Sequence, residues 1–250
     1  MLVSTVEQAL TELVEQHRVL YEGPTIEAKL RPLIRIGLHT NLTQGDVLHI
    51  LRTSRSVFFD THVEVVSGHH TATYLRFESI ARFPELIRKV AGDMAGWIQQ
   101  TFRNNPITGL VATSSAAEQL AEGIAAELRG TMRVNVALTS YSCETGRIGT
   151  DVAVGAIKSD QRFLALNDVT TRGNCVGKLG KVITDNGGVL AGMLVFARRD
   201  SGQFPLMNEL VARHPFYYTT DLDMPQWEPV HCPLCQANKT LISWRDLPAL

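Results

Sequence analysis

The segment FLALNDVTTRGNC (residues 163–175) decides the fold class that this sequence predicts. Its first four residues are apolar and predict a short buried strand. A polar loop, 167–175, follows, and Val176, Leu179 and Ile183 then recur at the spacing of one helix face. A strand that leads through a glycine-bearing polar loop into a helix is typical of an α/β sheet.

The same strand–loop–helix pattern extends to both sides of this segment. We predict strands over 109–112, 134–138, 163–166 and 189–196, and helices over 84–103, over 115–128 and from 176 to the glycines at 187–188. Because strands and helices alternate at this spacing, the fold class is α/β, with a mostly parallel sheet of four or five strands and helices on both faces.

The two ends of the chain are predicted to be additions to this core. Residues 1–80 form an N-terminal hood, residues 81–205 the core, and residues 206–250 a proline-bearing packed tail. Within the hood we expect a helix over 5–20, an irregular stretch over 21–55 with a short helix near 46–51, and two strands, 57–66 and 73–77, around a turn at 67–70.

Composition excludes several classes of protein. The 24 Lys+Arg and 25 Asp+Glu residues give a formal net charge of -1, so neither a nucleic-acid surface nor a basic membrane surface is expected. The longest apolar run, 189–197, is shorter than the about 20 residues that span a bilayer, and the N-terminus does not have the pattern of a signal peptide. Four cysteines in 250 residues do not make a disulfide framework. We therefore expect a reduced, cytoplasmic protein.

The loop 167–175 has the chemistry of a phosphate site. A helix N-terminus presents unpaired backbone N–H groups, and these attract anions. Gly173 lets the backbone approach a phosphate closely, and Thr171 adds a hydroxyl donor. Asp168 can accept hydrogen bonds from ribose hydroxyls or hold Mg²⁺ through water. The plainer alternative is that Asp168 only caps a helix or satisfies the loop.

These residues resemble the phosphoribosyl pyrophosphate motif of type I phosphoribosyltransferases. In that motif an apolar strand is followed by two acidic residues, apolar residues, and then Thr/Ser, a small residue, Gly, any residue and Thr/Ser. Asp168, Thr171 and Gly173 match it, whereas Asn167 replaces the first acid and Cys175 replaces the last hydroxyl. The chain is similar above all to orotate phosphoribosyltransferase-like proteins, over about residues 60–205.

The flanking parts of that resemblance are the Ser-Gly turn at 67–70 followed by Tyr74, the strand and helix at 110–121, and the turn at 186–192. The resemblance implies transfer of a phosphoribosyl group from phosphoribosyl pyrophosphate to a nitrogenous base, with Mg²⁺ and a homodimer. It implies that Asp168 and Asn167 hold the ribose hydroxyls, and that loop 140–151 closes over the site. The implied substrate-binding residues are Val169, Thr170, Thr171, Arg172, Gly173, Asn174, Cys175, Thr113, Ser114, Ser115, Arg147, His69 and His70.

Some features favour other interpretations. Orotate enzymes carry basic residues in two loops, yet 112–117 has no Lys or Arg and 139–151 has only Arg147, which argues against orotate as the base. The same lack of cations favours a non-catalytic protein of this fold that binds phosphoribosyl pyrophosphate or a nucleotide and regulates a partner. A nucleotide-consuming hydrolase is a third alternative. Arg172 can contact phosphate or be solvated, and Cys175 is interpreted as a packing residue.

Cys232 and Cys235 are spaced like half of a structural zinc site. A zinc ion needs four ligands, so His231, His214 or a partner chain would have to complete it. The alternative interpretation is a packed, reduced cysteine pair. A redox role is not expected, because the proline-rich tail lacks the β–α context of thioredoxin-type motifs.

Overall fold

The computed structural model describes residues 2–199 and 205–249 of the chain. Its helices are α1 (Leu2–Glu22), α2 (Ile26–Leu30), α3 (Gln44–Thr53), α4 (Phe77–Ala81), α5 (Pro84–Thr101), α6 (Ala116–Leu128), α7 (Asn174–Asp185), α8 (Pro205–Arg213) and α9 (Pro233–Gln236). Its strands are β1 (Ile34–Ile36), β2 (Val57–Phe58), β3 (Val63–Glu64), β4 (His70–Thr71), β5 (Tyr74–Leu75), β6 (Gly109–Thr113), β7 (Asn135–Ser142), β8 (Arg147–Val154), β9 (Arg162–Thr170), β10 (Val189–Arg199), β11 (Phe216–Leu222), β12 (Gln226–Trp227) and β13 (Ile242–Ser243).

The main sheet has seven strands in the order β1-β11-β10-β9-β6-β7-β8. The five central strands are parallel to one another, while β1 and β8 pair antiparallel at the two edges. The α/β prediction is confirmed, although the sheet is larger than the four or five strands expected. Of the additional strands, β1 lies in the stretch predicted to be irregular, β8 begins in the predicted loop 140–151, and β11 lies in the predicted tail.

The chain changes direction within the sheet between β6 and β9. From β6 it runs outward to β7 and β8, and then returns to the other side of β6 to form β9, β10 and β11 in sequence. In open α/β sheets, ligands bind outside the carboxyl ends of the strands at such a switch point. The loops that follow β6 and β9 therefore flank the predicted ligand position.

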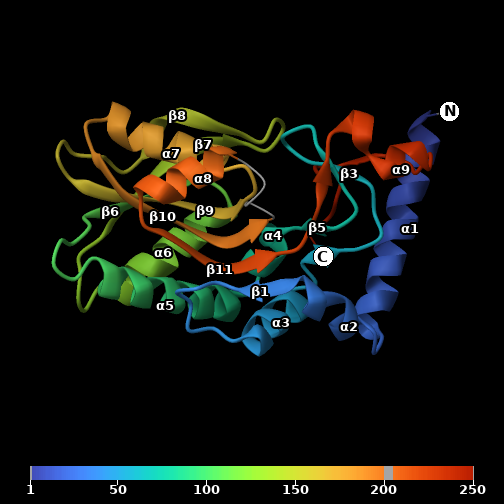
Figure 1. Cartoon of the computed structure of the whole chain (residues 1–250), viewed down its shortest axis with the longest axis horizontal. Helices are drawn as coiled ribbons and strands as arrows, with labels where there is room; N and C mark the ends of the chain where they lie inside the picture. Colours follow the sequence, from blue (N-terminus) through green and yellow to red (C-terminus); the bar gives the residue numbers. More distant parts are fainter. Residues whose placement is uncertain (1, 200–204, 250) are drawn as a thin grey trace.

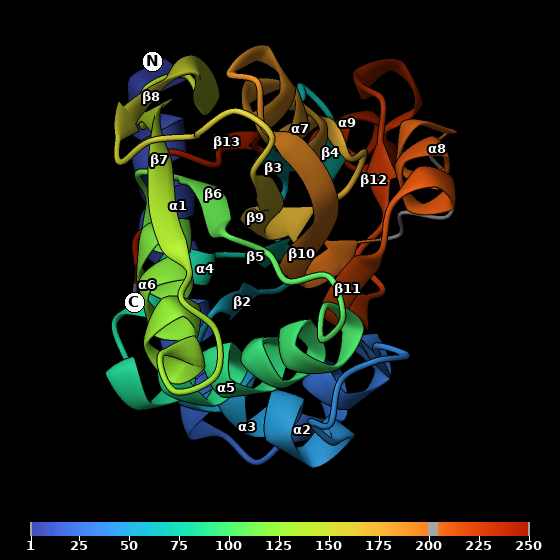
Figure 2. The same cartoon turned by 90° about the vertical axis from the view of Figure 1, so that its left-hand side faces the viewer.

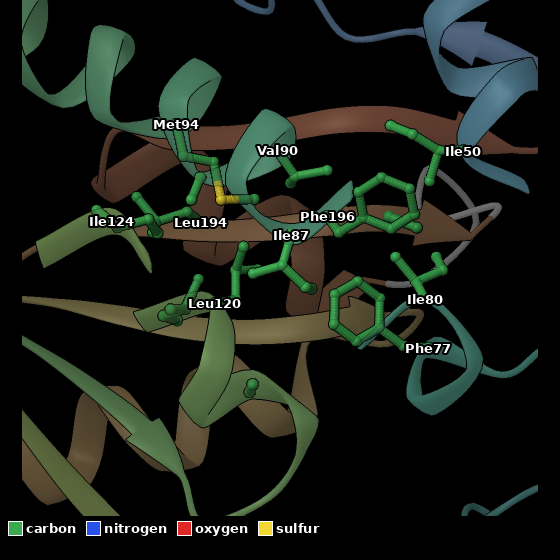
Figure 3. Close-up of a cluster of buried hydrophobic side chains, with 14 of the residues drawn as sticks. Ile50, Phe77, Ile80, Ile87, Val90, Met94, Leu120, Ile124, Leu194 and Phe196 are labelled. Atoms are coloured by element: carbon green, nitrogen blue, oxygen red, sulfur yellow. The ribbon is translucent and has the colours of Figure 1, made fainter. Parts of the chain in front are cut away.

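Helices cover both faces of this sheet, as Figure 1 and Figure 2 show. Leu164 and Leu166 of β9 belong to a buried cluster with α5 and α6, part of which Figure 3 shows. Phe163 and Ala165 point to the opposite face and pack with α7. Successive strand residues face opposite sides, so a strand buried on both sides must be apolar throughout. This explains why the run 163–166 identified the sheet.

Local sequence signals account for several helix starts. Thr43 and Asp46 form a reciprocal capping box at the start of α3. Pro84 occupies the first position of α5, as predicted, because its missing N–H has no partner to lose there. The Ser115 hydroxyl accepts a hydrogen bond from the Ala117 N–H at the start of α6. The predicted helix over 5–20 is confirmed as α1, whereas 21–55 is more regular than expected, because it contains α2, β1 and α3.

The hood contains short strands in place of the two long ones that were predicted. Asp60 and Gly68 have positive φ angles of 52° and 78°, so the chain turns sharply between β2 and β3 and again between β3 and β4. A small sheet of order β12-β4-β3-β13 forms, and β2 pairs with β5. The turn expected at 67–70 is present between β3 and β4. Segments from both ends of the chain thus build one small sheet.

The C-terminal segment contributes to the main sheet and to the small four-stranded sheet. Strand β11 lies inside the main sheet, while β12 and β13 form the two edges of the small sheet. The main sheet contains β1 from the predicted hood and β11 from the predicted tail, together with the strands of the core. It therefore does not mark boundaries at 80 and 205, and this division of the chain stays a prediction. Within residues 2–199 and 205–249, none of the helices has both the length and the apolar character needed to cross a bilayer.

Candidate functional site

A cavity of about 290 Å³ lies at the switch point of the main sheet. The loop after β9 forms one wall, the loop after β6 a second, and the small sheet a third. The lining residues are Val65, Val66, Ser67, Tyr74, Leu75, Phe77, Glu78, Thr113, Ser115, Tyr141, Gly146, Ile148, Asn167, Asp168, Val169, Thr170, Thr171, Arg172, Asn174, Cys175, Lys178, Arg199, Gln226 and Trp244. The structure therefore brings Thr113 and the residues of the loop 167–175 other than Gly173 to one cavity, where the resemblance implied that they would meet.

At the end of β9, the side chains of Asn167 and Asp168 are hydrogen-bonded to the backbone of the same strand. The Val169 N–H donates to Oδ1 of Asp168 at 2.7 Å, and Nδ2 of Asn167 donates to the Val169 carbonyl at 2.9 Å. Asn167 is buried and Asp168 is half-buried. The amide group of Asn167 thus keeps the loop in shape, while the carboxylate of Asp168 is left at the cavity wall.

Asp168 is an unusual acid in this setting. Burial raises the pKa of its carboxyl group to about 7, and the negative charge of Glu78 on α4 raises it further, against the lowering effect of backbone hydrogen bonds. Ionised Asp168 is therefore costly near neutral pH. A bound cation or a set of hydroxyl donors would offset that cost, so the group suits a polar ligand.

The N-terminus of α7 opens onto the same cavity. Gly173 precedes this helix with φ 81°, a conformation that favours glycine, and a side chain there would press against Leu210 and Met207. Thr171 and Arg172 line the cavity beside the first turn. The hydroxyl of Thr170 is buried and has no hydrogen-bond partner within the described residues. The loop thus offers N–H and hydroxyl donors together, which suits a phosphate.

The loop after β6 is held by hydrogen bonds between its own residues. Thr113 Oγ1 lies 2.7 Å from Ser115 Oγ, and the Ser115 N–H donates to the Thr113 carbonyl at 2.8 Å. Thr113 and Ser115 both line the cavity, whereas Ser114 is exposed and is not among its lining residues. Two hydroxyls therefore face the loop of β9 across the switch point.

Two basic residues that the sequence reasoning missed line the cavity. Lys178 lies one helical turn after Asn174 on α7, and Arg199 ends β10, the strand beside β9. Nη2 of Arg199 donates to Thr71 Oγ1 and to the Thr73 carbonyl, each at 3.3 Å. The helical spacing from Asn174 to Lys178 was a usable signal. With Arg172, three basic side chains of the described residues line the cavity, although the two expected loops hold almost none.

Residues 140–151 form the end of β7, a turn and most of β8, so the structure has a β-hairpin here in place of the expected irregular loop. The strands pair antiparallel, and the tip touches the tail, where Nη1 of Arg245 donates to the Glu144 carbonyl at 2.7 Å. Tyr141, Gly146 and Ile148 of this hairpin line the cavity. Arg147 is exposed on β8 and does not line it, because side chains alternate along a strand.

Aromatic residues also line the cavity. Trp244 follows β13 and Tyr74 begins β5, and both line the cavity. Burial raises the pKa of Tyr74 and of Tyr141 well above the ordinary value, so both phenols stay protonated and can donate hydrogen bonds. Burial likewise raises the pKa of Cys175 to about 11, which agrees with the expectation that Cys175 packs and does not react.

The predicted histidines lie away from this cavity. His69 is half-buried in the turn, with Nδ1 3.3 Å from Ser67 Oγ, and does not line the cavity. His70 is buried beside His62, Cys232 and Cys235. The reason is register: His70 pairs with Glu64 in the small sheet, and its side chain faces away from the cavity lining.

The histidines expected beside the cysteine pair also lie elsewhere. The His231 side chain is 78% exposed and is 3.8 Å from Glu228, and His214 directly follows helix α8. The structure groups the cysteines with two hood histidines instead, which no local sequence signal indicated.

Comparisons with known proteins bear on this site. No family model matches the chain. Among curated proteins, the orotate phosphoribosyltransferase of Chlorobium phaeobacteroides is 24% identical over 199 residues, which cover 78% of this chain and 92% of the relative. The orotate phosphoribosyltransferase of Thermus thermophilus is 26% identical over 197 residues, covering 78% of this chain and 98% of the relative.

Solved structures that are similar to this chain are also phosphoribosyltransferases. Adenine phosphoribosyltransferase from Leishmania tarentolae matches with a TM-score of 0.51 and 11% identity, over 72% of this chain and 89% of that one. Orotate phosphoribosyltransferase from Mycobacterium tuberculosis, in complex with Fe(III) dicitrate, matches with a TM-score of 0.50 and 16% identity, over 70% of this chain and 96% of that one. At these identities the match concerns the fold.

Proposed function

Since this chain has the type I phosphoribosyltransferase fold and resembles orotate phosphoribosyltransferases in sequence, as its motif predicted, we propose that it is a phosphoribosyltransferase. It transfers the phosphoribosyl group of phosphoribosyl pyrophosphate to a nitrogenous base and releases pyrophosphate. The observation that carries the proposal is the position of Asp168 and the α7 N-terminus at the switch point, in one cavity with Thr113 and Ser115.

The reaction requires the cavity to hold a sugar phosphate between two groups. A lone pair of the base nitrogen forms the new bond to ribose C1′ while the bond from C1′ to the pyrophosphate oxygen breaks. The electron pair leaves on pyrophosphate, and the N–H proton of the base passes to solvent. Such a displacement depends on positioning and on stabilising charge on the leaving group.

Each wall of the cavity suits one part of this substrate. We propose that the N-terminus of α7, from Thr171 to Cys175, binds the 5′-phosphate through backbone N–H groups, as helix N-termini bind anions. Ionised Asp168 accepts hydrogen bonds from the ribose hydroxyls, and Asn167 keeps that loop in shape. Thr113 and Ser115 face the pyrophosphate from the first loop.

The basic side chains complete this assignment. Lys178 and Arg199 supply positive charge for phosphate and pyrophosphate, which the two expected loops do not. Tyr74 and Trp244 offer flat surfaces for a planar base, and Gln226 offers an amide that can exchange hydrogen bonds with ring nitrogens and carbonyls.

Mg²⁺ belongs to this proposal. The donors at the cavity fit the ion, since Asp168 and Glu78 are carboxylates and Mg²⁺ prefers oxygen ligands. Burial and the charge of Glu78 make ionised Asp168 costly, and a divalent cation beside it would offset that cost. When bound, the ion would neutralise charge on the departing pyrophosphate.

The test is calorimetric titration of the purified protein with phosphoribosyl pyrophosphate and Mg²⁺, followed by a pyrophosphate-release assay with orotate, uracil, adenine and hypoxanthine. Release with one base, lost in Asp168→Asn, is the expected result. Binding without release for any base would favour the non-catalytic binder. Turnover of a nucleotide without phosphoribosyl pyrophosphate would favour a hydrolase. No binding at all would overturn the assignment of this cavity.

A further inference from the structure

A second cluster of functional side chains lies outside the cavity, where the hood meets the tail. His62 and His70 come from the hood, and Cys232 and Cys235 come from the segment around α9. One nitrogen or sulfur atom from each residue lies within 4.8 Å of every other. His62, His70 and Cys232 are 1%, 4% and 0% exposed, and Cys235 lies at the surface. Two imidazoles and two thiols therefore converge in a largely buried position.

The distances match the edges of a zinc tetrahedron. Zn–N bonds of about 2.0 Å and Zn–S bonds of about 2.3 Å place ligand atoms about 3.3 Å apart for N and N, and about 3.5 Å apart for N and S. Here His62 Nε2 lies 3.0 Å from His70 Nδ1, and 3.5 Å and 3.6 Å from the sulfur atoms of Cys232 and Cys235. The Cys235 sulfur lies 3.3 Å from His70 Nδ1.

Hydrogen bonding alone does not account for this arrangement. A neutral imidazole nitrogen has either one proton or one lone pair, so it serves one good partner. His62 Nε2 has three partners at hydrogen-bonding distance. The other ring nitrogen, Nδ1, lies 2.8 Å from the Lys239 carbonyl and must donate a proton to it. The Nε2 lone pair therefore points into the cluster, and such a bond to a carbonyl typically orients a metal-bound histidine.

We propose that His62, His70, Cys232 and Cys235 form a structural zinc site that fastens the tail to the hood. Four protein ligands leave no open position for a substrate, as in structural sites. This proposal does not depend on the transferase activity. It also replaces the sequence-based ligand His231, which is exposed and lies beside Glu228.

The site would hold one wall of the substrate cavity. His62 directly precedes β3, His70 begins β4, and the Ile242 N–H of β13 donates to the His62 carbonyl at 2.9 Å. The same small sheet carries Gln226 and leads into Trp244, which line the cavity. Because two-residue strands are weak by themselves, an ion that links them would stabilise the sheet.

The experiment measures metal in the full-length protein. After purification under reducing conditions without chelator, elemental analysis should find about one zinc per chain, as four ligands imply. Cobalt(II) added to the metal-free protein should give the intense visible bands and the thiolate charge-transfer bands of a tetrahedral N₂S₂ site. Absence of bound zinc together with no uptake of either ion would overturn the proposal.

Variants identify the ligands. His70→Asn and Cys232→Ser should lower the affinity for zinc by more than about 100-fold. Loss of a residue that only hydrogen-bonds to a metal ligand lowers metal affinity by about 10- to 100-fold, and loss of a ligand itself should have a larger effect. His231→Asn and Cys143→Ser are matched controls and should retain the metal, because neither residue belongs to the cluster. Retention of zinc in His70→Asn, or its loss in His231→Asn, would show that the assigned ligands are wrong.

Hydrogen exchange tests the structural role without using activity. Removing zinc from the wild-type protein should speed amide exchange in 62–75 and 226–245, while β6, β9 and β10 stay protected, because the ion joins only the small sheet. Unchanged exchange in both segments would overturn the proposed fastening of the tail.

Discussion

Asp168 and Glu78 line the same cavity, and burial together with the negative charge of Glu78 raises the pKa of Asp168 to about 7. The two acids come from different segments, since Glu78 lies on the short helix α4 and Asp168 ends β9. A carboxyl group with such a pKa changes charge within the range where most enzymes work. The pair therefore links stability, ligand binding and pH.

Asp168→Asn should lower the transfer activity and raise the stability of the protein at pH 8. The unfolded carboxyl group loses its proton near its ordinary pKa of 3.8 and the folded one near a pKa of about 7, so the folded state binds more protons between these values. The free energy of unfolding therefore falls as pH rises through this window. Asn resembles the protonated acid, so the variant should melt above wild type at pH 8 and near it at pH 5. Its phosphoribosyl transfer should fall by about 100-fold or more, because the ribose is no longer held. Equal melting temperatures at pH 8 would contradict the raised pKa.

Glu78→Gln should move the pH profile of the reaction. Removing its charge lowers the pKa of Asp168, because one of the two causes of the elevation disappears. The acid limb of the kcat/KM profile should therefore move to lower pH. Glu122→Gln, which removes a charge from the exposed face of α6, should leave the profile unchanged. An unmoved acid limb in Glu78→Gln would show that another group controls it.

Lys178→Gln should weaken binding of phosphoribosyl pyrophosphate by about tenfold, since one charge-assisted contact contributes roughly 1.4 kcal/mol. Lys181→Gln is the matched control, because Lys181 is on the same helix but pairs with Asp185 at 2.7 Å. Calorimetry at two salt concentrations measures both variants. Equal affinities of the two variants would show that Lys178 does not contact phosphoribosyl pyrophosphate.

Gly173→Val should abolish binding of the ribose phosphate. The φ angle of 81° is strained for a branched residue, and the new side chain would meet Leu210 at 3.1 Å and Met207 at 3.3 Å. Gly177→Ala lies one turn further on, where a Cβ has only an ordinary contact at 3.7 Å, so it should bind normally. Circular dichroism at the assay temperature shows whether each variant is folded. Normal binding by folded Gly173→Val would exclude this loop as the phosphate site.

His17→Phe should make the protein less sensitive to acid. His17 is packed against Phe58 and Tyr21, with ring centroids 4.3 Å and 4.5 Å away, and burial lowers its pKa from 6.5 to about 4. Between these values the unfolded state binds more protons, so the free energy of unfolding falls as pH falls. The loss between pH 7 and pH 5 should be about 2 kcal/mol smaller in the variant than in wild type, because one pH unit corresponds to about 1.4 kcal/mol. Urea denaturation measures it, and exposed His49→Asn should behave as wild type.

The core of the fold was predictable because burial on both faces leaves a continuous apolar signal. Residues 163–166 and 189–196 are such runs, and both are central parallel strands. Strand β8 was missed because it is an edge strand on which only Ile148 is buried, so its polar residues resembled a loop. Strand β11 was missed because Pro215 and Pro225 flank it and made the segment look irregular.

The candidate site was predictable where it is local. The loop 167–175 is continuous in sequence, so its residues could be recognised together. The approach of Glu78, Arg199 and Trp244 to that loop depends on tertiary contacts for which the sequence holds no periodic signal. The same holds for the cysteine pair, because His62 lies 170 residues before Cys232.

The small sheet also determines which part of the structure can form last during synthesis on the ribosome. Its strands β3 and β4 are synthesised early, but their partners β12 and β13, and Trp244 after them, emerge only after β11 of the main sheet. The nascent chain can collapse around β6, β9 and β10 before then, yet its cavity still lacks a wall. A product that stops short of β13 would lack Trp244 and with it part of the cavity wall, so translation must pass this residue before a ligand can be enclosed.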